Sequence, residues 1–296
     1  MDQKVTIVIP TFNRAHYVTK TIDSALAQTY PCSIIVCDHG SKDNTPEVMK
    51  TYGDKIKYIR RERDFGPHFC WLEGILHADT EYVHLHYDDD LMRPTFIEKT
   101  LPLMKDDVGV VFTEASVLDL KGTLFADKDI YKLKHRFKTG VYDNSLLEKM
   151  LLEGCMISPA ACLYRKKDVV DAIYPGDLPV NFGGNYHGAG PDHFMTLQTL
   201  LRYKNFGVVV ESLCILGSHD GSITMDACKD REKKIRLEKG YEAVRSYYRL
   251  LRIFQKNKRL HNNVKGIIKC ERFHKRLERR IKIILKAIGL RKKEVK

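Results

Sequence analysis

Three consecutive aspartates, Asp88, Asp89 and Asp90, follow a strand-like stretch in the sequence HLHYDDDLMRP (residues 84–94). Carboxylates this close repel one another, and each raises the pKa of its neighbours unless a cation or hydrogen-bond donors keep them ionised. Hard oxygen ligands of this kind suit Mg²⁺ or Mn²⁺ held jointly with substrate phosphates. The alternative is an acidic turn that caps a helix starting near Thr95, because aspartate also favours helix N-termini.

Three further residues could take part in such chemistry. Asp38 ends an apolar stretch, where a carboxylate can accept hydrogen bonds from a nucleobase or a ribose, although the same residue also suits a turn between strand and helix. Asp192 ends a segment rich in Gly and Pro (residues 174–194), and it could act as a general base or as a helix N-cap. His219, in GSHDGSIT, could bind a cation or a phosphate, or be an ordinary surface histidine.

The elements that must position these residues alternate along the first hundred residues. Apolar, strand-like runs alternate with segments of helical spacing, and the runs occupy residues 5–10, 33–37, 55–60, 82–87 and 108–112. This order predicts an α/β fold with a mainly parallel sheet flanked by helices. Ligands of such folds bind beyond the carboxyl ends of the strands. A polar cluster follows each of the first four runs, namely TFNR, DHGSKDNT, RERDFG and the aspartate triplet, so we expect these clusters to converge on one edge.

The remainder of the chain is less regular and more basic. Residues 119–145 are mixed in charge and are predicted to be irregular, whereas DHFMTLQTLLR (192–202) is predicted to be helical. We expect two domains, a catalytic domain over residues 1–225 and a basic helical extension over residues 226–296.

Most of the positive charge lies near the end of the chain. Of the formal net charge of +12, +10 falls between residues 264 and 296, where apolar residues occupy one helical face and Lys and Arg the other.

The composition is that of a globular protein, with 43% apolar and 30% charged residues. No apolar stretch approaches the ~20 residues that span a bilayer, and the N-terminus lacks the pattern of a signal peptide. The eight cysteines show neither a CxxC pair nor zinc-like spacing, which is typical of reduced structural thiols. We therefore expect a cytoplasmic protein, either soluble or peripheral on the cytoplasmic face of a membrane.

Taken together, five motifs resemble those of the family 2 glycosyltransferases, inverting enzymes of the GT-A fold (a nucleotide-diphospho-sugar transferase, Rossmann-like fold). The motifs are VIPTFNR, QTYPCSIIVCDHGSKDNT, the aspartate triplet with Pro94, GPDHFM and HDGSIT, in that order between about Val5 and Thr224. The resemblance implies a nucleotide-diphosphate sugar donor, with a UDP-sugar favoured, and Mn²⁺ or Mg²⁺ as cofactor. It also implies a glycan or lipid-linked acceptor in the synthesis of cell-envelope polysaccharide or another glycoconjugate.

The resemblance assigns a role to each matching position. Pro10, Thr11 and Asp38 would line the nucleoside pocket, and Asp192 would be the catalytic base. Asp88 and Asp90 would form the Asp-x-Asp pair, with Asp90 as the metal contact and Asp89 able to share it, and His219 would complete the metal or diphosphate shell.

Three positions depart from the family pattern. His39 stands where a second acid is usual, Pro191 replaces a glutamate that often precedes the base, and CWL (residues 70–72) replaces a polar triplet. The first departure leaves the identity of the donor nucleotide open. An inactive homologue is therefore one alternative that the sequence leaves open.

Two other functions compete with sugar transfer. A nucleotidyltransferase on a similar sheet usually carries a Gly-rich loop after the first strand, and TFNRAHY has no glycine. A non-enzymatic nucleic-acid binder would use the basic tail but would leave the four polar clusters without a role, so no nucleic-acid partner is expected. For residues 264–296 two interpretations stay open, a helix that lies on anionic membrane and a helix packed on the catalytic domain.

Overall fold

The computed structural model describes residues 3–118, 130–173, 190–218, 230–260, 272–281 and 283. These residues divide into two compact units, Met1–Tyr248 and Arg249–Lys296, and each is described by itself. The domain boundary predicted at residues 225 and 226 lies outside the described residues and stays a prediction, as does most of the Gly-rich segment before Asp192.

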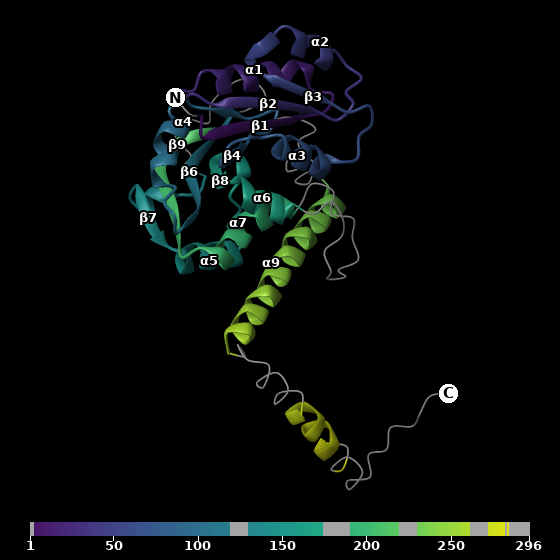
Figure 1. Ribbon diagram of the computed structural model, residues 1–296, viewed down its shortest axis with the longest axis vertical. Helices are drawn as coiled ribbons and strands as arrows, with labels where there is room; N and C mark the ends of the chain where they lie inside the picture. Colours follow the sequence, from purple (N-terminus) through teal and green to yellow (C-terminus); the bar gives the residue numbers. More distant parts are fainter. Residues whose placement is uncertain are drawn as a thin grey trace, which may run out of the picture. The chain divides into compact units, whose positions relative to one another are not determined.

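A sheet forms the centre of the first unit (Figure 1). Its strands follow the order β3-β2-β1-β4-β8-β6-β9-β5, and β7 pairs with β9. Their bounds are β1 Val5–Thr11, β2 Ser33–Asp38, β3 Lys57–Arg60, β4 Tyr82–Leu85, β5 Leu91–Met92, β6 Val108–Leu118, β7 Gly140–Asp143, β8 Cys162–Arg165 and β9 Asn205–Gly217.

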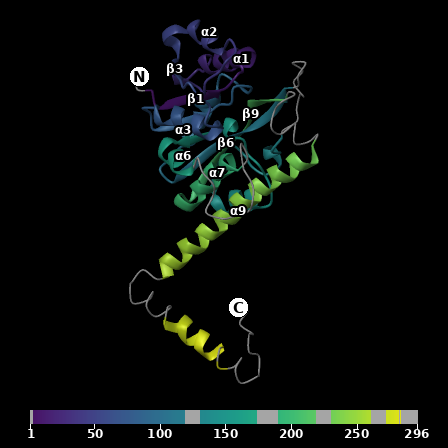
Figure 2. The ribbon, with the colours of Figure 1, turned by 90° about the vertical axis from the view of Figure 1, so that its right-hand side faces the viewer.

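Helices cover both faces of this sheet, with α1 and α2 on one face and α3, α6 and α7 on the other (Figures 1 and 2). The α-helices are α1 Ala15–Leu26, α2 Thr45–Lys50, α3 Pro67–Leu76, α4 Phe96–Thr100, α5 Asn144–Leu152, α6 Lys166–Ala172, α7 Pro191–Arg202 and α9 Arg231–Leu260. Short 3₁₀ turns η1 to η4 lie at Gly53–Lys55, Leu101–Leu103, Leu133–His135 and Pro159–Ala161.

The predicted α/β architecture is confirmed. Strands β1 to β4 pair with one another in parallel, and β1 is buried along its whole length, as its continuous apolar sequence predicts. The register pairs Thr11 with Asp38, the last residues of β1 and β2. The polar clusters that follow these strands therefore emerge at one edge. Beyond β4 the sheet is mixed, since β8 is antiparallel to β4 and β6.

Two local predictions need correction. Residues 119–145 are not irregular throughout, because β7 (Gly140–Asp143) pairs antiparallel with β9 and α5 begins at Asn144. The Asp143 side chain accepts a hydrogen bond from the Ser145 N–H and so caps α5. The segment of helical spacing between the runs 82–87 and 108–112 forms an α-helix only as far as Thr100, and a 3₁₀ turn follows from Leu101, consistent with the missing N–H of Pro102.

A close approach between α3 and the sheet depends on a glycine. A Cβ atom on Gly74 would lie 2.5 Å from Val8 Cγ1 and 3.3 Å from Cys37 Cβ. Both neighbours belong to buried strands, so neither can move far without disturbing β1 or β2. Gly74 thus allows α3 to cover the strands that carry Thr11 and Asp38.

Replacing Gly74 by Ala should overpack this contact and lower the free energy of unfolding by about 1–3 kcal/mol. Chemical denaturation followed by circular dichroism measures the change. Gly140→Ala is the matched control, because its Cβ would meet nothing nearer than Tyr142 at 3.9 Å, and it should change stability by less than about 0.5 kcal/mol. Equal stability of the Gly74→Ala variant and the parent protein would show that this contact has room for a methyl group.

Candidate active site

The ends of β1, β2 and β4 are joined by hydrogen bonds at the carboxyl edge of the sheet. The Thr11 hydroxyl donates to Asp88 Oδ2 at 2.9 Å, and the His39 N–H donates to the Thr11 carbonyl at 3.2 Å. Three of the predicted polar clusters are therefore in direct contact. Pro10, the residue before Thr11, is buried within β1.

The aspartate triplet forms a tight turn that neighbouring elements hold in place. The Asp90 N–H donates to the Tyr87 carbonyl at 3.1 Å. From α1, the Thr21 hydroxyl lies 2.9 Å from the carbonyl oxygens of both Asp88 and Asp90. From β9, the Gly217 N–H donates to Asp90 Oδ1 at 2.9 Å, and a Cβ atom on Gly217 would collide with the Asp89 carbonyl oxygen. This turn is therefore set by residues far apart in the sequence.

The triplet does not cap the helix that follows it. The N-cap of α4 is Thr95, no side chain makes a capping bond there, and the acid in its first turn is Glu98. The interpretation of the triplet as a helix cap is therefore wrong.

Mutual repulsion and burial perturb these carboxyls strongly. Burial, together with the charge of Asp89, raises the pKa of Asp88 to about 7, although Arg14 and the Thr11 hydroxyl act in the opposite direction. Burial and Asp89 also raise the pKa of Asp90, which is only 4% exposed, well above its usual value. Acidic oxygens destabilised in this way fit a hard divalent cation such as Mg²⁺ or Mn²⁺.

Asp192 lies in the first turn of α7 rather than at its N-cap, which is Gly190. Its Oδ1 accepts the Gly190 N–H at 3.0 Å, and its Oδ2 accepts the Tyr241 hydroxyl of α9 at 3.3 Å. Burial raises the pKa of Asp192, against the effect of these donors. The carboxylate is thus oriented by two donors and made more basic by its surroundings.

The pKa of Tyr87 is affected both by Asp192 and by members of the triplet. Burial and the negative charges of Asp192, Asp90 and Asp89 raise the pKa of Tyr87, so these carboxylates all act on one phenol. The Tyr87 ring lies against Trp71 of α3, with ring centroids 5.5 Å apart.

Three aromatic residues of this site, Trp71, Tyr87 and Tyr241, were not predicted from the sequence. Only Tyr87 had a local signal, because it stands directly before the three aspartates.

Asp38 is fully buried, and its carboxylate holds the structure around it. Oδ1 accepts the Ser41 N–H at 2.8 Å, Oδ2 accepts the Tyr58 hydroxyl at 2.6 Å, and Arg60 Nε lies 3.5 Å from Oδ2. These contacts fix the loop after β2. The roles of Asp38, Pro10 and Thr11 toward a nucleoside stay predictions. His219 lies outside the described residues, two positions after the Gly217 that contacts Asp90.

The family model described as glycosyl transferase family 2 matches residues 6–171, more than half of the chain. The chain belongs to this family. It is 34% identical over 176 residues to an uncharacterized glycosyltransferase of Rickettsia typhi, a match that covers 56% of this chain and 53% of that protein. It is 29% identical over 102 residues to the glycosyltransferase GlyA of Streptococcus pneumoniae, covering 33% and 14% respectively. The chain thus spans about half the length of the rickettsial relative and less of GlyA.

Solved structures share the fold. The S. aureus TarS 1–349 complex with UDP-GlcNAc aligns with a TM-score of 0.58 and 18% identity, over 74% of this chain and 60% of that one. The mannosyltransferase PcManGT from Pyrobaculum calidifontis, in complex with GDP-Man and Mn²⁺, aligns with a TM-score of 0.54 and 14% identity, over 92% and 79%. These similarities confirm the GT-A fold.

The pKa of Asp88 predicts opposite effects of pH with and without a cation. Because its pKa is about 7 in the folded protein and near ~3.9 in an unfolded chain, the folded state binds this proton more tightly. The metal-free protein should therefore lose stability as the pH rises through 7. Mn²⁺ competes with the proton, so the stabilisation by Mn²⁺ should be larger at pH 8 than at pH 6. Thermal unfolding at both pH values, with and without Mn²⁺, measures both effects.

Asp88→Asn removes one titrating group and should reduce the pH dependence of both the stability and the stabilisation by Mn²⁺. The matched control is Asp79→Asn, which replaces an exposed carboxyl and should leave this pH dependence unchanged. Stabilisation by Mn²⁺ that is equal at both pH values in the parent protein would show that Asp88 does not take part in binding the cation.

Proposed function

We propose that this chain transfers a sugar from a nucleotide-diphosphate donor to an acceptor hydroxyl, with inversion at the anomeric carbon and in dependence on a divalent cation. The observation that carries the proposal is the set of hydrogen bonds that hold two acidic groups in place. The aspartate triplet is held by Thr21 and Gly217, and Asp192 is held by the Gly190 N–H and the Tyr241 hydroxyl. A carboxylate cluster suited to a cation and a half-buried carboxylate suited to proton transfer are the two groups that a single displacement requires.

Each group would act at one end of the reaction. When bound, Mn²⁺ or Mg²⁺ would offset the negative charge that develops on the leaving diphosphate. Asp90 and Asp88 would hold the cation, with Asp89 and His219 as further ligands. Asp192 would accept the proton of the attacking hydroxyl, while the Gly190 N–H and the Tyr241 hydroxyl keep its carboxylate oriented. No covalent nucleophile on the protein is required.

We infer a UDP-sugar as the favoured donor and a glycan or lipid-linked molecule as the acceptor, in envelope polysaccharide or glycoconjugate synthesis. Support for the donor class comes from two fold neighbours, one with UDP-GlcNAc and one with GDP-Man and Mn²⁺. Because they carry different nucleotides, they support a nucleotide-diphosphate sugar more strongly than any one base. Membership of the family gives no support to a nucleotidyltransferase or to a nucleic-acid binder.

Asp192→Asn keeps the shape of the side chain but removes its basicity. Transfer, measured as release of the nucleoside diphosphate in the presence of acceptor, should fall by about 10²–10⁴-fold. Binding of the donor, measured by calorimetry, should stay unchanged because the triplet is intact.

Tyr241→Phe is the comparison for this variant. It removes a single 3.3 Å hydrogen bond to Asp192 and should cost much less activity than Asp192→Asn. Near-normal turnover of the Asp192→Asn variant would show that Asp192 is not the catalytic base. If the parent protein itself shows no turnover, the chain is an inactive homologue.

We further propose that the second unit, Arg249–Lys296, attaches to an anionic membrane surface. Its helical residues 272–281 carry Phe273, Leu277 and Ile281 at helical spacing, with exposed fractions of 65%, 44% and 47%, among several arginines. Such a helix can insert its apolar face between lipid headgroups while each basic residue near the surface adds ~1 kcal/mol. No helix in the described ranges is both long and apolar enough to cross a bilayer.

Flotation with vesicles that contain phosphatidylglycerol tests this attachment. The full chain should float with the vesicles at low salt, and deletion of residues 264–296 should abolish flotation. A double variant, Phe273→Ser with Leu277→Ser, keeps the charge and should weaken binding to an intermediate degree. If deletion leaves flotation unchanged, the helix does not attach to the membrane.

A further inference from the structure

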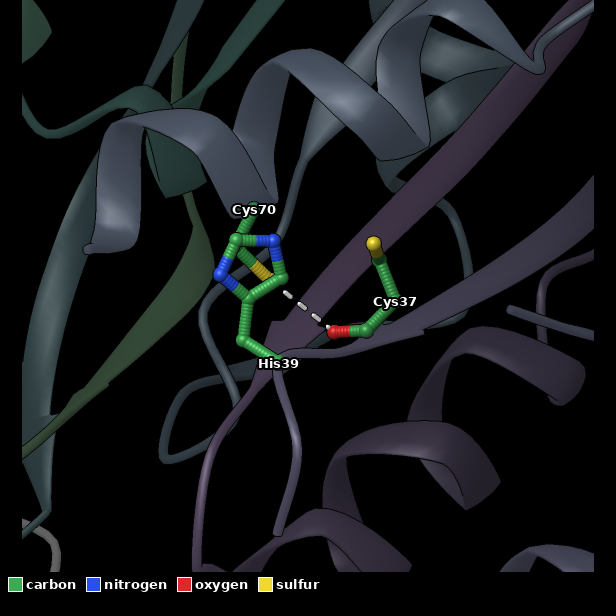
Figure 3. A group of neighbouring side chains, drawn as sticks. All are labelled: Cys37, His39 and Cys70. Atoms are coloured by element: carbon green, nitrogen blue, oxygen red, sulfur yellow. Dashed lines mark hydrogen bonds between the residues drawn. The ribbon is translucent and has the colours of Figure 1, made fainter. Parts of the chain in front are cut away.

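A buried cluster of two thiols and one imidazole lies at the end of β2 (Figure 3). Cys37 lies in β2, and His39 lies in the bend directly after the last residue of that strand. The third member, Cys70, comes from α3, which packs on β1 and β2. The ligand atoms of all three residues lie within 4.8 Å of one another, and the residues are 0%, 1% and 3% exposed.

The imidazole of His39 is oriented in the way that metal-binding histidines usually are. Its Nδ1 lies 3.4 Å from Asp64 Oδ1, and its Nε2 is buried without a hydrogen-bond partner. A buried ring nitrogen without a partner has its hydrogen-bonding capacity unused, and beside two thiols a metal ion can take it up. A carboxylate that accepts the N–H of one ring nitrogen leaves a lone pair on the other, and this arrangement is frequent around zinc.

We propose that Cys37, His39 and Cys70 bind one Zn²⁺ ion, separate from the cation expected at the aspartate triplet. Zinc favours thiolate and imidazole ligands at ~2.3 and ~2.0 Å, which corresponds to ligand atoms ~3.3–3.8 Å apart. From a limit of 4.8 Å, the side chains need to approach by no more than about 1–1.5 Å. Three protein ligands leave the fourth tetrahedral position to water.

The chemistry of the two sites keeps their cations apart. Two thiolates and an imidazole are borderline-soft ligands that favour zinc, whereas the triplet offers only hard carboxylate oxygens. Binding releases the two thiol protons to solvent, and the Cys70 thiol gives up its 3.0 Å hydrogen bond to the Cys37 carbonyl. No local motif indicates this site, because Cys70 comes from a different element and not from a CxxC or C-x-H-x-C pattern.

A bound zinc ion would tie the end of β2 to α3. Asp38 stands between two of the ligands, and its carboxylate is held from elsewhere by Ser41, Tyr58 and Arg60. The ion would therefore fix the loop that is expected to face the nucleoside. It would also give a role to His39, the residue that departs from the usual acid at this position.

The test measures metal directly on the full chain, purified under reducing conditions and freed of metal with a chelator. Titration with Zn²⁺ against a chromophoric chelator should give one tightly bound equivalent, and Co²⁺ in its place should give thiolate-to-metal charge-transfer absorption. Cys37→Ser and Cys70→Ser should each lose that absorption, while Asp64→Asn should weaken Zn²⁺ binding by about 10–100-fold. Circular dichroism checks that each variant folds.

Two control variants show whether the zinc is held by this cluster and not elsewhere in the chain. Cys162→Ser replaces a buried thiol outside the cluster and should keep the zinc, as should Asp90→Asn in the triplet. The proposal is overturned if the parent protein binds no stoichiometric Zn²⁺ or gives no charge-transfer absorption with Co²⁺. It is also overturned if zinc is lost only in Asp90→Asn. None of these readouts depends on sugar transfer, so the proposed function can fail while this site stands.

Discussion

Repulsion among three carboxylates at one sheet edge is the constraint on which the rest of the site depends. Asp90 is buried and Asp88 is half-buried beside Asp89, and the pKa of each is raised. The groups that hold the turn are mainly neutral donors, the hydroxyls of Thr11 and Thr21 and the N–H of Gly217. They fix its geometry without neutralising its charge, which is the condition under which a divalent cation binds with the greatest gain.

The fold assembles this turn from distant parts of the chain. Parallel pairing of β1, β2 and β4 brings three polar clusters to one edge, and β9 returns 127 residues after Asp90 to place Gly217 against it. The first turn of α7 carries Asp192, and the first part of α9 supplies the Tyr241 hydroxyl that orients it. The charges of Asp192, Asp90 and Asp89, together with burial, raise the pKa of Tyr87.

Much of this arrangement could be predicted from local patterns. Continuous apolar runs identified the strands, and polar residues at their ends identified Thr11, Asp38 and the triplet. Whether the triplet capped α4 could not be decided from sequence, because aspartate suits both roles and the answer depends on the backbone at Thr95. The pairing of β9 with β5 and β6, and with it the Gly217 contact, is set by long-range packing that no local pattern encodes. Tyr241 was missed for the same reason, since its partner lies 49 residues away.

The cation and diphosphate site at the triplet is tested most directly by a calorimetric titration with nucleoside diphosphates, in the presence and absence of Mn²⁺. The full chain and the Asp90→Asn variant would be compared with UDP and GDP. We expect that one diphosphate binds the parent protein in the presence of Mn²⁺, that binding weakens strongly without the cation, and that Asp90→Asn abolishes this dependence. Equal affinity with and without Mn²⁺, or the same dependence in Asp90→Asn, would contradict a cation and diphosphate site at the triplet.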